Sequence, residues 1–99
     1  MNQRLSAFEQ YLRKEEKSEN TIEKYLRDAR GFLGFLAGQN ICKQVVMSYK
    51  EHLTARYAPV SVNSMLIAVN RFLRFCGLGS CCVRLLKIQR QMYCAEERE

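Results

Sequence analysis

The chain of 99 residues is long enough for one domain with a modest core, and its 47 % hydrophobic and 26 % charged residues exclude an intrinsically disordered protein. A net charge of +6 and a pI near 9.3 favour a polyanionic partner, either nucleic acid or an anionic membrane surface, although such a charge also serves solubility. No apolar run approaches the roughly 20 residues that cross a bilayer, and the first residues lack the apolar core of a signal peptide, so we expect a cytoplasmic protein.

The sequence predicts an all-α bundle of four to five short helices, because apolar residues recur at three- and four-residue steps and hairpin signals are missing. The first helix is predicted over residues 3–16. The second begins with Asn20 as its N-cap, and Glu23 completes a capping box. Within it, Gly31 and Gly34 either allow another helix to approach closely or mark fraying near the helix end. Its end is expected at Gly38 and Asn40, and its inner stripe comprises Ile22, Tyr25, Leu26, Ala29, Leu33 and Leu36, widened by Phe32 and Phe35.

The third helix is predicted over residues 43–57 and is followed by Pro59, which stops it. The fourth is predicted over residues 62–76 with Ser61 as its N-cap, and the short turn between these two helices resembles a helix-turn-helix. Beyond Gly79, residues 83–88 are expected to form a short fifth helix that exposes Arg84, Lys87 and Arg90.

The sequence offers no evident catalytic or metal site. The five cysteines form no Cys-x-x-Cys pair, so free thiols are favoured over a zinc site, with Cys76 in the core and Cys81 and Cys82 partly exposed. Tyr49 and His52 are the nearest approach to a nucleophile beside a base, and a surface contact is the simpler interpretation. We therefore expect no cofactor, no metal and no active site.

Basic side chains gather on three stretches of the sequence. Lysine and arginine neutralise phosphates, and asparagine, serine and arginine also bind base edges, so the pattern fits DNA binding, although an ordinary solvated helix face carries such residues as well. By stretch, these residues are Lys24, Arg27 and Arg30; Asn63, Ser64, Asn70, Arg71 and Arg74; and Arg84, Lys87 and Arg90.

Two segments resemble the N-terminal, SAM-like core-binding domain of phage and transposon integrases, which are tyrosine recombinases. The first is residues 18–28 followed by residues 32–36, with a Thr-Ile pair, a tyrosine three residues later and a Phe-Leu-Gly-Phe-Leu end. The second is residues 61–76, with a serine at its start, a Leu-x-Ala core and a Phe-x-x-Phe end. The likeness covers roughly residues 4–78, and it weakens after Gly77, where the Asn-Pro pair common in the family is missing.

The resemblance implies a helical bundle that forms half of a C-shaped clamp on DNA, with the second and fourth helices at the major groove of the core site. It implies double-stranded DNA and other recombinase protomers as partners, a mobile element as source and a nucleoid location. Catalysis in this family belongs to a separate C-terminal domain. We therefore expect a non-enzymatic core-binding domain over residues 1–90 and the start of a linker over residues 91–99. The expected DNA contacts are Lys24, Arg27, Arg74 and Lys87 on phosphates, Asn63, Ser64 and Arg71 on bases, and also Thr21.

Two other functions fit the same sequence. A small protein-interaction module would use the aromatic side chains of Phe32, Phe35 and Phe75 as a groove for a partner helix. A free-standing helix-turn-helix repressor would need a dimer and a palindromic site.

Overall fold

The computed structural model describes residues 2–87 and contains four α-helices and one 3₁₀ turn, with no strand in that range. The predicted all-α fold is therefore confirmed. Within the same range, no helix is long and apolar enough to cross a membrane. In chain order the elements are α1 (Asn2–Lys14), α2 (Glu19–Leu36), α3 (Lys43–Arg56), α4 (Pro59–Phe75) and the 3₁₀ turn η1 (Gly79–Cys81).

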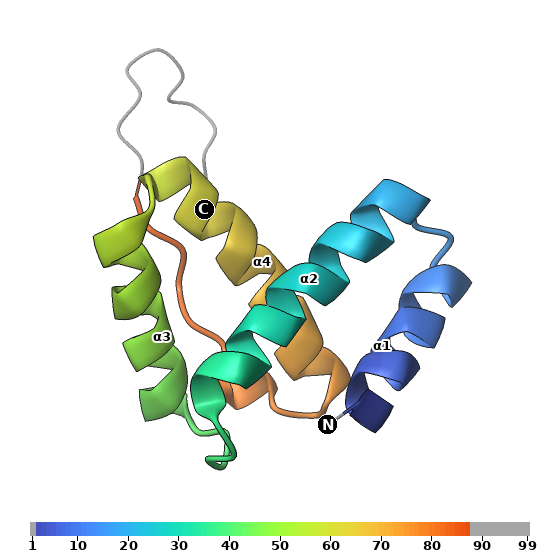
Figure 1. Cartoon of the computed structure of the whole chain (residues 1–99), viewed down its shortest axis with the longest axis horizontal. Coiled ribbons are helices and arrows are strands. Elements are labelled where there is room, and N and C mark those ends of the chain that lie inside the picture. The colour runs from blue at the N-terminus through green and yellow to red at the C-terminus, as the bar shows by residue number, and fades with distance from the viewer. Residues whose placement is uncertain (1, 88–99) are drawn as a thin grey trace.

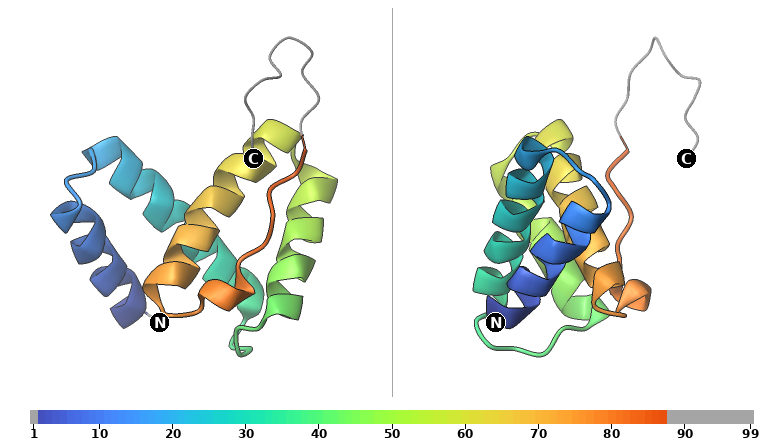
Figure 2. Two further views of the ribbon diagram at one scale, coloured as in Figure 1. Left: turned by 180° about the vertical axis from the view of Figure 1, so that it is seen from behind. Right: turned by 90° about the vertical axis from the view of Figure 1, so that its right-hand side faces the viewer.

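The two longest helices, α2 and α4, cross and form the centre of the bundle (Figure 1). α1 packs against α2 on one side of this crossing, and α3 packs against α4 on the other. The N-terminal halves of α2 and α4 diverge from the crossing toward the same end of the molecule, as the views of Figure 2 also show. This end therefore brings together two helix segments that lie about 40 residues apart in the sequence.

Two clusters of buried side chains hold the helices together. The smaller cluster joins α1, α2 and α4, and in it the rings of Phe8 and Phe72 meet edge to face with centroids 5.1 Å apart. The larger cluster joins α2, α3, α4 and the chain after η1, and Phe32 lies fully buried within it against Tyr49. Burial of these apolar side chains supplies most of the stabilisation of a bundle with short connections.

The close helix approach considered for the two glycines of α2 occurs at one of them. A Cβ atom added at Gly31 would lie 3.3 Å from the hydroxyl oxygen of Tyr49 on α3, whereas a Cβ at Gly34 would meet no atom within 4 Å. Gly31 therefore leaves room for the tyrosine, while Gly34 has no packing role of this kind.

The predicted start of the second helix is wrong by two residues. Ser18, not Asn20, is the N-cap of α2, and its hydroxyl oxygen accepts a hydrogen bond of 3.2 Å from the backbone N–H of Thr21. Serine and asparagine are comparable caps, so the sequence pattern did not decide between them. The helix ends at Ala37, which adopts the left-handed conformation at φ 50°, one residue before Gly38.

The predicted start of the fourth helix is also wrong. Ala58 is the N-cap of α4 and Pro59 is its first residue, so the helix begins before Ser61. A proline fits the first helical position because its fixed φ suits the helix and the N–H that it lacks would have no partner there. Pro59 therefore starts α4, and α3 already ends at Arg56.

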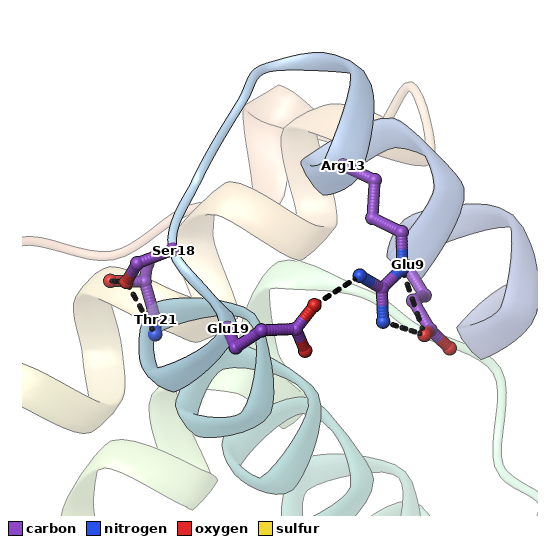
Figure 3. A network of polar contacts seen from close by, with 5 residues as sticks. All are labelled: Glu9, Arg13, Ser18, Glu19 and Thr21. Carbon is purple, nitrogen blue, oxygen red and sulfur yellow. Dashed lines mark hydrogen bonds and ion pairs between the residues drawn. The ribbon is translucent and has the colours of Figure 1, made fainter.

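An exposed network of charges closes the corner between α1 and α2 (Figure 3). The guanidinium of Arg13 donates hydrogen bonds to Glu9 at 2.8 Å on its own helix and to Glu19 at 2.6 Å on the first turn of α2. The hydrogen bond from Arg13, and then its charge, hold the pKa of the Glu19 carboxyl below its usual range. The pair is solvent-exposed, so its contribution to the free energy of unfolding is small.

The predicted fifth helix does not form over residues 83–87. After η1, residues 82–87 form an extended segment, here named the strap, which runs between α3 and α4 (Figure 2). Side chains of α3 and α4 bind its backbone groups, which removes the need for hydrogen bonds within a helix. Residue 88 of the predicted helix, the expected exposure of Arg90 and the proposed linker at residues 91–99 lie outside the described residues.

The corrected cap of α2 can be tested with two alanine substitutions. We expect Ser18→Ala to lower the free energy of unfolding by about 1 kcal/mol, because one N–H group of the first turn loses its acceptor. Asn20→Ala is the matched control and should change it much less. Urea denaturation followed by circular dichroism measures both, and an equal loss from the two variants would contradict Ser18 as the cap.

Candidate nucleic-acid interface

Lys24 joins α2 to α4 at the end of the molecule where the two helices diverge. Its ammonium group donates a hydrogen bond of 2.5 Å to the carboxylate of Asp28 and one of 2.9 Å to the backbone carbonyl of Ser64. Both contacts are partly buried, so water competes little for them. The predicted site residues Lys24 and Ser64 are therefore brought into direct contact across the two helices.

Asp28 is the buried charged residue at this junction, with 8 % of its surface exposed. Its carboxylate is 2.5 Å from Lys24, and the Nε atom of Arg27 lies 3.8 Å from its second oxygen. A buried carboxylate requires such partners because its desolvation is costly. The pattern of basic residues did not predict a role for Asp28. A lysine four residues before an aspartate on a helix is nevertheless a recognisable ion-pair spacing.

The two remaining α2 residues of the predicted site lie within one helical turn of Lys24. The side chain of Arg27 is 71 % exposed and leaves most of its guanidinium open to solvent. Thr21 is half-buried, and its hydroxyl accepts a hydrogen bond of 3.0 Å from the Ser18 hydroxyl (Figure 3). The first half of α2 thus presents one exposed cation beside one paired cation.

On α4, four residues at helical spacing form a single exposed or half-buried strip. Ser64 and Arg71 are half-buried, while Ile67 and Arg74 are exposed. The strip extends away from the Lys24 contact, and Arg74 lies about 15 Å along the axis from Ser64, beside η1. Ile67 is not among the predicted contacts, and its 46 % exposure puts an apolar side chain between the polar ones.

The other two predicted residues are Asn63 and Lys87. Asn63 binds the strap at the residue before Lys87. The Asn63 amide donates a hydrogen bond of 3.0 Å to the carbonyl of Leu86 and accepts one of 2.6 Å from its N–H group. Lys87, the next residue, is exposed and is therefore held near the N-terminal half of α4. The side-chain amide of Asn63 makes these two hydrogen bonds, so within the structure Asn63 binds the strap.

The described residues contain no cluster of side chains suited to a metal ion. Among residues 2–87, no three His, Cys, Asp or Glu side chains group together as ligands. His52 is exposed, and its ring stacks on that of Tyr49 with centroids 6.1 Å apart and lies tilted against that of Phe35 with centroids 5.2 Å apart. Burial raises the pKa of the half-buried Cys76 thiol above its usual value. Cys81 was predicted to be partly exposed, and this is wrong, because it is buried under α4 in the larger cluster.

The chain matches the family described as the phage integrase N-terminal SAM-like domain over residues 5–77. The match begins within α1, includes α2, α3 and α4, and ends at Gly77 after α4. No curated protein and no solved structure shows a significant match to the chain.

The Lys24 contact can be tested through stability. We expect Lys24→Met to lower the free energy of unfolding by about 1–3 kcal/mol, because the buried Asp28 carboxylate and the Ser64 carbonyl lose their donor. Adding Asp28→Asn to this variant should restore part of the loss, since no unpaired carboxylate then remains. Urea denaturation supplies the measurement, and Lys14→Met at the exposed end of α1 is the control. A loss no larger than that of the control would show that Lys24 does not join the helices.

Proposed function

The chain belongs to the phage integrase N-terminal SAM-like domain family, and we propose that it binds double-stranded DNA at the core site of a site-specific tyrosine recombinase. The position of the N-terminal halves of α2 and α4 at the same end of the bundle, joined by Lys24, is the observation that carries this proposal. Thr21 and Arg27 from α2, Ser64 from α4 and Lys87 from the strap lie toward that end, and Arg71 lies about two turns further along α4. A helix end with polar and basic side chains suits the major groove, where phosphates position a protein and base edges specify the sequence.

The paired contacts divide the expected roles among these residues. Arg27 and Lys87 are exposed and are suited to phosphates, whereas the charge of Lys24 is shared with Asp28 before DNA arrives. Ser64 and Arg71 remain the proposed base contacts. Arg74 stands apart near η1 and would reach only the DNA backbone further along the duplex.

We propose further that the chain takes no catalytic part in recombination. Strand cleavage would belong to a separate domain of the parent recombinase, and this domain would also contact other protomers in the synaptic complex. The sequence motif of the family and the match to its N-terminal domain support this division of work. A location at the DNA of the cell follows from the same proposal.

The alternative of a protein-interaction groove lined by aromatic side chains has less support. Phe32 is fully buried, and Phe35 and Phe75 pack against the two clusters. Phe75 lies 5.4 Å from Phe8 and Phe35 lies 5.0 Å from Tyr49, measured between ring centroids. These aromatic rings stabilise the bundle, and a partner helix would have to displace them.

Salt dependence tests DNA binding directly. With about five phosphates contacted, we expect the affinity for a random duplex to fall on the order of 10²–10³-fold between about 50 mM and about 200 mM salt. Arg27→Gln should lower the slope of log affinity against log salt by about 1, because one phosphate contact is lost. Fluorescence anisotropy with a labelled duplex measures both quantities.

The control for this experiment is Arg4→Gln, which removes the same charge from the N-terminal end of α1, away from the proposed face. It should leave the slope unchanged. Binding that is absent at low salt, or equal slopes for the two variants, would contradict the proposed face.

A further inference from the structure

The backbone of the strap is bound by side chains of two helices. Six nitrogen–oxygen hydrogen bonds connect it to Lys43 and Lys50 of α3 and to Asn63 and Asn70 of α4. The lysines donate to the carbonyls of residues 82 and 84 at 2.8 and 2.7 Å. Each asparagine both donates to and accepts from one strap residue, so it replaces the partner that a neighbouring strand would supply.

The spacing of the two asparagines matches the extended strap. Asn63 and Asn70 lie seven residues apart, which is about 10 Å along α4. Val83 and Leu86, the residues that they bind, lie three residues apart, which is also about 10 Å in an extended chain. The strap therefore runs antiparallel to α4 with a defined register, because Asn70 binds Val83 and Asn63 binds Leu86.

This register decides which strap side chains face the solvent. Val83 is 7 % exposed and Leu86 packs against the larger cluster, so both anchor the strap in the bundle. Arg84 and Lys87 are exposed. Because Leu86 is bound by Asn63 and the strap runs antiparallel to α4, the adjacent Lys87 lies toward the N-terminal end of α4.

We propose that the strap is an arm of the DNA-binding face and that Asn63 and Asn70 are positioning residues that hold it there. This inference rests on the proposed function. In its docked position the strap extends the face defined by α2 and α4 with the cation of Lys87. Asn63 acts on DNA through Lys87, and it does not itself touch a base.

A double-mutant cycle separates positioning from direct contact. We expect Lys87→Gln and Asn63→Ala each to weaken binding to a random duplex at low salt about threefold to tenfold and to lower the salt slope by about 1. If Asn63 acts through Lys87, the double variant should bind no more weakly than either single variant. Asn63→Ala combined with Arg27→Gln is the reference pair, and its effects should multiply, because Arg27 lies on another helix.

Amide hydrogen exchange in the absence of DNA supplies the second readout. The N–H group of Leu86 should lose protection in Asn63→Ala, and that of Val83 should lose it in Asn70→Ala. Asn40→Ala, in the exposed loop between α2 and α3, is the matched control and should leave both unchanged. Thermal melts verify that the variants fold, and Asn70→Ala, which releases the strap at Val83, replaces Asn63→Ala in the cycle with Lys87→Gln if Asn63→Ala unfolds.

Multiplying effects of Asn63→Ala and Lys87→Gln would overturn the inference, because Asn63 would then contact DNA independently. Unchanged protection of Leu86 in Asn63→Ala would overturn it as well. A wild-type chain that binds no duplex at low salt would instead refute the proposed function, and the role of the strap in DNA binding would be refuted with it.

Discussion

The contact of the Lys24 ammonium with both Asp28 and the Ser64 carbonyl is the constraint on which the proposed face depends. Apolar packing at the crossing of α2 and α4 brings the helices together, but it is weakly directional. A charged group that must satisfy a buried carboxylate and a backbone carbonyl at once tolerates little sliding of one helix along the other. The buried aspartate thus makes the relative position of Lys24 and Ser64 specific.

Helix α4 is the element that all other parts of the described structure contact. On α4, Phe72 contacts α1, Ser64 binds α2, and Asn63 and Asn70 bind the strap. Helix α3 packs against α4 in the larger cluster. What remains open to solvent is the first turn of α4, at residues 59–61, and the strip with Ile67 and Arg74. A helix anchored on several sides presents its remaining side chains with little freedom, and such preorganisation favours binding because less conformational entropy is lost.

The net charge of +6 overstates how many cationic side chains are free to bind a polyanion. Lys24 is paired with Asp28, Arg13 is paired with two glutamates, and Lys43 and Lys50 donate to strap carbonyls. A lysine bound to a carbonyl keeps its charge, so it still contributes to the long-range potential, but moving it to a phosphate would break a contact within the protein. The penalty is smaller for Arg27, whose side chain is 71 % exposed and lies 3.8 Å from Asp28, and Lys87 is also exposed.

Much of the fold could be predicted from the sequence, because the three- and four-residue recurrence of apolar residues is a local property that fixes which face of each helix is buried. The four helices and their approximate ends followed from it, and so did the resemblance to the integrase domain. Helix starts were less certain, since Ser18 and Asn20, or Ala58 and Ser61, differ little in local preference. The partners of the polar side chains could not be predicted. Lys24 binds a carbonyl 40 residues away, and Asn63 and Asn70 bind a strap that local pattern assigned to a helix. The sequence by itself determined the helices and their charge, whereas only the tertiary structure decided which polar groups stay free, because a hydrogen bond depends on atoms that folding brings within about 3 Å.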